Sequence, residues 1–318
     1  MTILLVVLAI LALIVGGLVA FTANTARKIE AAFPPPGRFM EIDGQRIHYV
    51  DKGQGPAIVM IHGLGGNLMH YTYALADRLT KDHRVIMVDR PGSGHSLRPK
   101  GMPANLAAQA ETLATLMRNL ELDRPVLVGH SLGGALSLTI AANHPDCAGA
   151  VALIAPLTHA RHEVPQAFKG LEIASRPLRT AVSWTLALPL SILNGKKVLG
   201  FVFGPDPVPA DFPTRAGGLL GLRPKAFYNT SSDLMAVNDD MPAVMQRYGA
   251  IAYPIGMLFG RGDKLLDYRI DGEGMKQKCP QLDLRLMEGG HMLPLTAPEP
   301  CETLIRDIAA RRYAAAAA

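Results

Sequence analysis

The segment that most constrains the fold of this chain is a short apolar run that ends in a glycine-rich turn around one serine. Val126–Val128 is fully apolar, Gly129-His130-Ser131-Leu132-Gly133 follows it, and the next residues, to Asn143, are mainly leucine, alanine and glycine. These patterns predict a buried strand and then a helix. A sharp turn between the two leaves no room for side chains beside the serine, which explains the flanking glycines. We therefore expect Ser131 to lie at the end of a buried strand.

Short apolar runs alternate with longer helical stretches along much of the remaining chain. This alternation predicts right-handed crossovers and an α/β fold with a mostly parallel, doubly wound sheet and helices on both faces. Besides Pro125–Val128, strands are expected at Phe39–Ile42, Arg46–Val50, Ala57–Ile61, Arg84–Val88, Ala150–Ile154, Ile255–Phe259 and Leu282–Met287. Helices are expected at Asn67–Thr80, Ala104–Leu120, Ser131–Asn143 and Glu299–Arg312.

Residues 156–253 interrupt this alternation. They are rich in proline, glycine and apolar residues and contain no clear strand. We expect a mostly helical cap over the C-terminal edge of the sheet, where open α/β sheets bind their ligands. Within it, Trp184–Leu193 and Val198–Phe203 are unusually apolar. Two interpretations stay open: the core of the cap, or an apolar funnel for an acyl chain that opens toward a bilayer, with Trp184 contacting the substrate.

A membrane anchor is expected at the N-terminus. Residues 3–21 are an uncharged apolar run of 19 residues. As a helix this run would extend about 28 Å, close to the roughly 30 Å hydrocarbon core of a bilayer. A cleaved signal peptide is the alternative, but no basic residue precedes the run, which is longer than a usual h-region. Arg27 and Lys28 follow it, which favours a cytoplasmic location for the rest of this single-pass membrane protein.

Domain boundaries follow from the anchor and the cap. Residues 1–22 are expected to form the anchor, and 23–37 a stalk and linker that ends in Pro34-Pro35-Pro36-Gly37. The prolines break any helix and stiffen the connection. The α/β core then comprises residues 38–155 and 254–318.

Composition argues against several other kinds of function. The formal net charge is +5, but no run of five Lys or Arg occurs, so no nucleic-acid partner is expected. Cys147, Cys279 and Cys301 do not have metal-ligand spacing. His159 and His162 are close in sequence but lack a carboxylate or a further histidine in register, so no metal site is expected. The sequence does not predict a cofactor.

Two further residues complete the chemistry that a serine nucleophile requires. A serine hydroxyl needs a base, and the base needs an orienting group. Asp263 follows the strand expected at Ile255–Phe259, and His291 follows the last expected strand, in the chain order Ser, Asp, His. Both lie at the sheet edge where Ser131 emerges. Asp263 then orients His291, which takes the Ser131 proton, and Asp267 is the reserve acid.

A site for the oxyanion is expected after the strand Ala57–Ile61. This strand ends in His62-Gly63-Leu64-Gly65-Gly66, a flexible turn whose backbone N–H groups can face a ligand. We assign the oxyanion hole to the N–H groups of Leu64 and Leu132. His62 is expected to fix the loop, and His62, Gly63 and His130 are expected to lie beside the substrate.

Five motifs of this chain occur together in one known family: His62-Gly63, Asp89–Ser96, Gly129–Gly133, Gly260–Asp263 and Gly290-His291. By these motifs, residues 38–312 resemble the α/β-hydrolase superfamily. The resemblance implies an eight-stranded sheet, a cap domain and hydrolysis without a cofactor. Within the superfamily the chain is similar to the epoxide hydrolase and haloalkane dehalogenase branch, whose nucleophile is an aspartate. Ser131 stands at that position, which argues against both activities.

The sequence therefore predicts a hydrolase that cleaves a carboxylic ester through an acyl-enzyme. The expected substrate is a small hydrophobic ester, lipid-like or with a medium-length acyl chain. Two alternatives use the same triad, a C–C bond hydrolase and a cofactor-free haloperoxidase. A third alternative is a ligand-binding or scaffold protein that retains the fold without catalysis.

Overall fold

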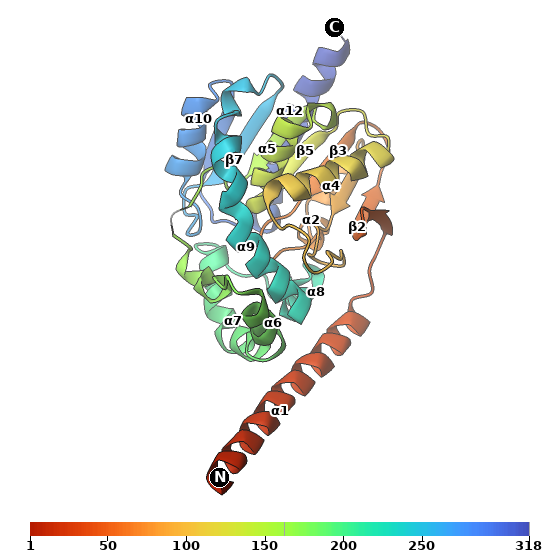
Figure 1. The fold of residues 1–318 in the computed structure, drawn as a ribbon. Coiled ribbons are helices and arrows are strands. Elements are labelled where there is room, and N and C mark those ends of the chain that lie inside the picture. The colour runs from red at the N-terminus through yellow and green to blue at the C-terminus, as the bar shows by residue number, and fades with distance from the viewer. Residues whose placement is uncertain (162, 318) are drawn as a thin grey trace.

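Eight strands form one sheet within the described residues, which are 1–161 and 163–317 of a computed structural model (Figure 1). Their spatial order is β1-β2-β4-β3-β5-β6-β7-β8. β2 pairs antiparallel with β1 and β4, and every other neighbouring pair is parallel. The predicted fold class is confirmed, and each predicted strand lies within two residues of an observed one. The strands are Arg38–Ile42 (β1), Gln45–Lys52 (β2), Ala57–Ile61 (β3), Arg84–Val88 (β4), Val126–His130 (β5), Ala150–Ile154 (β6), Ile255–Gly260 (β7) and Asp283–Met287 (β8).

Helices connect the parallel strands and cover both faces of the sheet (Figure 1). In the described part of the chain they are Thr2–Ala32 (α1), Met69–Thr72 (α2), Ala76–Leu79 (α3), Leu106–Asn119 (α4), Leu132–Asn143 (α5), Arg176–Trp184 (α6), Ala187–Phe203 (α7), Phe212–Arg215 (α8), Pro224–Met245 (α9), Gly274–Lys278 (α10), Leu293–Thr296 (α11) and Pro298–Ala317 (α12).

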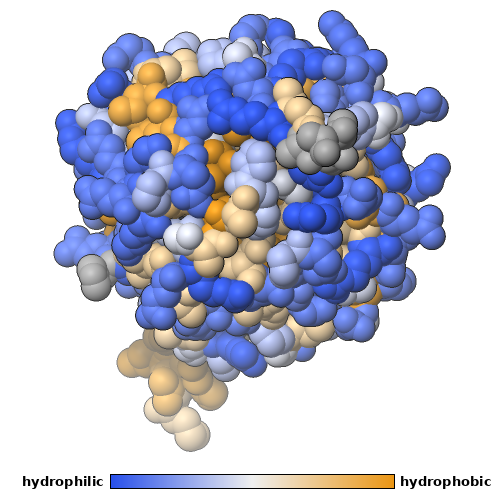
Figure 2. All heavy atoms as spheres, turned by 90° about the horizontal axis from the view of Figure 1, so that it is seen from above, coloured by the Kyte–Doolittle hydropathy of each residue, from blue (hydrophilic) through white to orange (hydrophobic). Residues whose placement is uncertain are grey.

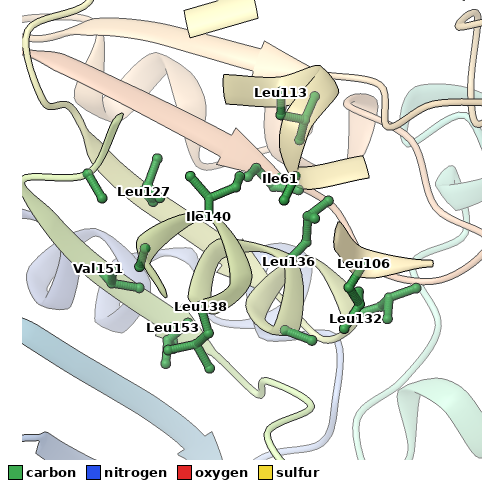
Figure 3. Close-up of a cluster of buried hydrophobic side chains, with 14 of the residues drawn as sticks. Ile61, Leu106, Leu113, Leu127, Leu132, Leu136, Leu138, Ile140, Val151 and Leu153 are labelled. Carbon is green, nitrogen blue, oxygen red and sulfur yellow. The ribbon is translucent and has the colours of Figure 1, made fainter. Parts of the chain in front are cut away.

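The central strand β5 is buried on both faces, because successive side chains of a strand point to opposite sides. Leu127 belongs to the apolar cluster that includes side chains of α4 and α5 (Figure 3). Val126 and Val128 belong to the opposite cluster, which includes side chains of α2, α3 and α12. Truncation of a fully buried leucine typically costs about 2–5 kcal/mol. This packing fixes the end of β5, and with it the position of Ser131.

The helix predicted for residues 67–80 is divided into the short helices α2 and α3. The backbone N–H of Arg78 donates to the Leu75 carbonyl at 3.2 Å instead of continuing the regular pattern. The Ala74 carbonyl, its regular acceptor, receives the Arg78 Nε–H at 3.1 Å. A side chain therefore competes with the backbone at this point, and the prediction of one continuous helix was wrong.

Helices fill the described part of the segment between β6 and β7. α6, α7, α8 and α9 lie there without a strand among the described residues, and short 3-10 helices occur at Gln166–Leu171 and Gly218–Leu222. α9 is the longest of these helices and contacts α4, α5 and α6. We refer to this helical segment as the cap, as in the sequence-based expectation for residues 156–253.

α1 stands clear of the domain in its first half and packs against it in its second half (Figure 1). Side chains through Gly17 are exposed, Leu18 is half-buried, and Thr22 and Ile29 are buried. α1 contacts α6 and the 3-10 helix Gly218–Leu222. α1 is 31 residues long, and its most apolar 18-residue window has a mean hydropathy of 3.2. These properties would allow it to cross a membrane, and a signal sequence would share them.

Candidate active site

Ser131 lies between β5 and α5 in a strained backbone conformation. Its φ of 54° and ψ of −122° fall in a region that residues with a side chain rarely occupy. The flanking glycines allow this turn. A Cβ on Gly129 would overlap the Gly133 carbonyl oxygen, and a Cβ on Gly133 would overlap the Ile61 carbonyl oxygen. Ser131 is therefore held at the C-terminal edge of the sheet, beside the N-terminus of α5, where the helix dipole favours negative charge.

The loops after β7 and β8 bring an aspartate and a histidine together. His291 Nδ1 lies 2.7 Å from Asp263 Oδ2, and the two side chains are only 4% and 1% exposed. The other Asp263 oxygen accepts the backbone N–H groups of Leu265 and Leu266 at 2.8 and 3.0 Å. The carboxylate thus accepts from three donors. Because Asp263 occupies Nδ1 of His291, Nε2 is the ring nitrogen that can face a neighbouring group.

His130 connects the serine turn to the histidine loop. Its Nε2–H donates to the His291 carbonyl oxygen at 3.0 Å, and the two imidazole rings are 4.8 Å apart. Burial lowers the pKa of His130 well below the ordinary value, so the ring is neutral. Among the described residues, no hydrogen bond joins the Ser131 hydroxyl to the His291 ring. Such bonds often tighten only when a substrate is bound.

The loop after β3 lies directly against the serine. A Cβ on Gly63 would come within 2.9 Å of the Ser131 Cβ, so this loop can approach only because the residue is glycine. Leu132 is the first residue of α5, and its N–H has no acceptor within the helix. The Leu64 N–H makes no hydrogen bond to another described group. Neither N–H has an acceptor among the described groups, and their role as oxyanion donors stays a prediction.

His62 fixes this loop from inside the protein, as predicted. Its Nδ1–H donates to the Gly63 carbonyl at 2.8 Å, and its Nε2 accepts the Arg90 backbone N–H at 3.1 Å. Burial, and then the nearby Arg90 charge, lower the pKa of His62 to about 3. The ring is therefore neutral, which lets one nitrogen donate and the other accept. His62 is fully buried, so its role in the structure is to shape the loop.

Arg90 links the same loop to the cap. Its Nη2 donates to the Gly63 carbonyl at 3.2 Å, and its Nη1 forms a 2.8 Å ion pair with Asp233 of α9. Asp233 also pairs with Arg98 at 2.7 Å, and all three side chains are buried. Removal of one partner from such a buried pair typically costs about 3–5 kcal/mol. α9 is thereby fixed to the loop that carries Leu64.

A second carboxylate of the cap binds the loop that carries His291. Asp206 follows α7, and its Oδ2 accepts the Gly290 N–H at 2.9 Å and the Thr296 hydroxyl at 3.1 Å. A Cβ on Gly290 would come within 2.5 Å of the Phe203 carbonyl oxygen, so the end of α7 is packed closely on this loop. The residue before His291 is therefore held by the cap.

Three further residues have expected roles that no described contact supports: Trp184, Asp267 and His162. Trp184 lies at the end of α6 and is 42% exposed. No described contact joins it to Ser131, Asp263 or His291, and its role as a substrate contact stays a prediction. Asp267 bonds the Arg269 N–H at 2.9 Å and does not contact His291. His162, considered with His159 as a metal ligand, lies outside the described residues.

Arg90, Asp206 and Asp233 were not predicted to support the site. Arg90 occurs in the Asp89–Ser96 segment, which the sequence marks as a glycine-rich turn without indicating a partner for the charge. The two cap carboxylates belong to no recognisable motif. Their roles depend on how the cap packs on the core, which local sequence patterns do not specify.

An eight-stranded sheet with a serine at a strained strand-to-helix turn and an Asp–His pair at neighbouring strand ends defines the α/β-hydrolase type of architecture. Residues 56–188 match the family described as "alpha/beta hydrolase fold". A Mycobacterium tuberculosis protein named only as uncharacterised is 28% identical over 276 residues, which cover 84% of this chain and 79% of that protein.

Solved structures show the same fold. An alpha/beta hydrolase fold protein from Burkholderia ambifaria has a TM-score of 0.73 and 21% identity, covering 87% of this chain and 98% of that one. A bacterial membrane phospholipase A has a TM-score of 0.68 and 24% identity, covering 98% of this chain and 96% of that one. The chain therefore has the α/β-hydrolase fold, and residues 56–188 of its 318 match that family.

Proposed function

We propose that this protein is a serine hydrolase that cleaves a carboxylic ester through a covalent acyl-enzyme. The observation that carries the proposal is the buried 2.7 Å contact between Asp263 and His291, at the sheet edge that holds Ser131 in its strained turn. An aspartate on Nδ1 of a histidine orients the ring and stabilises its protonated form during the reaction. His291 Nε2 then acts as the base for Ser131.

In the first half of the proposed reaction, Ser131 Oγ attacks the ester carbonyl carbon while His291 takes the hydroxyl proton. The N–H groups of Leu64 and Leu132 stabilise the oxyanion, and one such donor is typically worth about 3–4 kcal/mol. The ester C–O bond then breaks, and the alcohol leaves with the proton from His291. Water next attacks the acyl-enzyme with His291 as base, which releases the carboxylic acid and regenerates Ser131.

The acyl group of the proposed substrate is apolar, lipid-like or of medium length. Two observations support this class: the apolar α1 at the N-terminus and the exposed apolar side chains of α6 and α7 in the cap. The fold shared with a membrane phospholipase A makes phospholipid esters natural members of a test panel. Rates on p-nitrophenyl esters should rise from acetate to octanoate, and a flat series would argue against an apolar acyl site.

A fluorophosphonate probe tests the proposed chemistry directly. We expect the full-length protein to be labelled, Ser131→Ala to be unlabelled, and His291→Asn to be labelled much more slowly. An unlabelled wild-type protein, or equal labelling of Ser131→Ala, would reject the serine hydrolase proposal and favour a ligand-binding role. Labelled protein that cleaves no ester but cleaves a C–C bond next to a ketone would support the C–C hydrolase alternative.

We also propose that α1 is retained as a single-pass anchor with the domain in the cytoplasm. Burial of Thr22 and Ile29 against the domain supports retention, because loss of the helix would expose the surface that it covers. Arg27 and Lys28 at its end support the orientation. Intact-mass analysis should find the apolar residues 3–21 on the purified protein. A C-terminal fluorescent protein should be bright and a C-terminal alkaline phosphatase inactive, and the reverse result would place the domain outside.

A further inference from the structure

α6 presents apolar side chains to solvent and polar ones to the protein. Its buried residues are Arg179 and Ser183, and the Arg179 Nε donates to Ser231 Oγ of α9 at 3.0 Å. Leu178 and Trp184 are instead 54% and 42% exposed. A surface helix of a protein in water has the opposite arrangement, with its apolar stripe toward the core. α6 is therefore suited to an apolar environment outside the protein.

α7 extends this apolar surface. It bends from α6 by 76°, and Leu193 is 79% exposed. Burial of one such side chain is typically worth about 1.5–3 kcal/mol, so leaving several of them in water is unfavourable. Nine large hydrophobic residues outside α1 are exposed in the described part of the chain, and six of them lie in or between α6 and α7. The other three are Leu97, Met235 and Ile270. The cap apolar surface consists of Leu178, Trp184, Leu186, Leu190, Ile192 and Leu193.

The charged residues of α6 and α7 themselves have one sign. Residues 173–205 contain no aspartate or glutamate. Arg176, Lys196 and Lys197 lie in this range and are exposed. Basic residues beside exposed apolar helices favour the surface of a bilayer that contains anionic lipids.

The contacts of α1 fix the depth of this surface relative to a membrane. Leu18 is the first half-buried residue of α1 and Thr22 the first buried one, so α1 reaches the domain where its apolar run ends at Phe21. The 19 residues of that run extend only about 28 Å as a helix, so a bilayer core of roughly 30 Å leaves no apolar residue as a spacer. α6 is one of the elements that α1 contacts. When α1 crosses a bilayer, α6 therefore lies at the level of the lipid headgroups.

We propose that the cap apolar surface rests in the membrane as a second, shallow lipid contact beside α1. α6 and α7 then lie in the interface, with the apolar side chains about 5–10 Å below the headgroups. Lys196 and Lys197 extend toward lipid phosphates. The end of the molecule opposite the N-terminus of α1 is mainly hydrophilic (Figure 2), as this orientation requires. The proposal rests on the proposed anchoring of α1 and does not depend on catalysis.

Trp184 allows a direct test because it is the single tryptophan of the chain. The full-length protein is reconstituted into vesicles of phosphatidylcholine and phosphatidylglycerol, with or without bromine on the upper acyl chains. We expect brominated lipid to reduce the Trp184 emission at least about twofold, because the ring lies at the depth of the bromine atoms. Replacement of Ile192 and Leu193 by aspartate should relieve this quenching, whereas Leu97→Asp should not.

A relocated probe serves as the matched control. Trp184→Phe combined with Tyr313→Trp places the tryptophan near the C-terminus in α12, at the far end of the molecule (Figure 1), and brominated lipid should leave its emission unchanged. Equal Trp184 emission in brominated and plain vesicles would overturn the proposal. Emission that shifts to the blue with protein density but does not respond to brominated lipid would also overturn it, in favour of a contact between two copies of the chain.

Discussion

Gly63 lies so close to Ser131 that one methyl group would fill the space between them. A Cβ on Gly63 would come within 2.9 Å of the Ser131 Cβ and 3.3 Å of His130 Nδ1. The loop has little freedom to retreat, because His62 and Arg90 both donate to the Gly63 carbonyl. The absence of a side chain at this position therefore sets the distance between the nucleophile and the proposed oxyanion hole.

Gly63→Ala is expected to displace the Leu64 N–H and lower kcat on an ester substrate by about 10–100-fold, the usual effect of misplacing a catalytic group by roughly 1 Å. Gly170→Ala is the matched control, because a Cβ there would meet no atom within 4 Å. It should retain wild-type activity. Full activity of Gly63→Ala would show that Leu64 does not contribute to the oxyanion hole.

Asp263→Asn tests the proposed orienting group at nearly constant size. The amide can present an N–H to His291 Nδ1 and stabilise the wrong tautomer, so we expect kcat to fall by about 10³–10⁴ with little change in KM. Asp267→Asn is the control, since Asp267 bonds the Arg269 N–H and not His291. A larger loss in Asp267→Asn than in Asp263→Asn would transfer the role to the reserve acid.

Two carboxylates of the cap are attached to two different loops of the site. Asp233 of α9 reaches the loop before Leu64 through the Arg90 side chain. Asp206, at the end of α7, binds the N–H of Gly290 directly. α6 and α7, which carry the cap apolar surface, thus connect through α7 to the loop of His291. At the level of elements, the cap supports the arrangement of the site in addition to covering the sheet edge.

Asp206→Ala is expected to lower kcat by about tenfold or more, because the loop of His291 loses two hydrogen bonds that position it. Asp206→Asn keeps an acceptor oxygen and should retain much of the activity. If Asp206 acted only through its negative charge, Asp206→Asn would lose as much activity as Asp206→Ala. Asp211→Ala removes a nearby carboxylate that bonds Tyr73 and Arg215 and should leave kcat unchanged. Equal loss in both alanine variants would indicate general damage to the cap.

Over the whole molecule, features set by neighbouring residues were predictable from the sequence. The turn at Ser131 follows from glycine spacing, and the strands follow from short apolar runs. The meeting of Asp263 and His291 was also predictable, although the residues are 28 apart, because parallel strands end at one edge of the sheet. α1 follows from the length of one apolar run.

Contacts between the cap and the core were not predictable in this way. Arg90 and Asp233 are 143 residues apart, and Asp206 and Gly290 are 84 apart, with no repeating strand order to relate them. The exposure of Leu178 and Trp184 was equally hidden, since an apolar helix within a cap is compatible with burial. These features depend on the packing of whole elements, which periodicity does not encode.

Three buried histidines surround the proposed oxyanion loop and make the stability of the whole molecule depend on pH. Burial lowers the pKa of His62 to about 3 and of His70 to about 4, and that of His130 well below its ordinary value. All three are neutral in the folded protein near neutral pH. In the unfolded chain each takes up a proton near its ordinary pKa of about 6.5.

The free energy of unfolding should therefore decrease as the pH falls below about 6.5, because the unfolded chain then binds protons that the folded protein does not bind. Each histidine adds a slope of up to about 1.4 kcal/mol per pH unit. Buried Asp271, whose pKa burial raises to about 6, acts in the opposite direction between about pH 4 and 6. His70→Gln should lower the slope of the free energy of unfolding against pH by up to about 1.4 kcal/mol per pH unit. The reason is that the unfolded chain then binds one proton fewer. Urea unfolding of the detergent-solubilised protein between pH 4.5 and 7.5 measures this slope, and a stability that stays constant or rises toward pH 4.5 would contradict the assignment of neutral buried histidines.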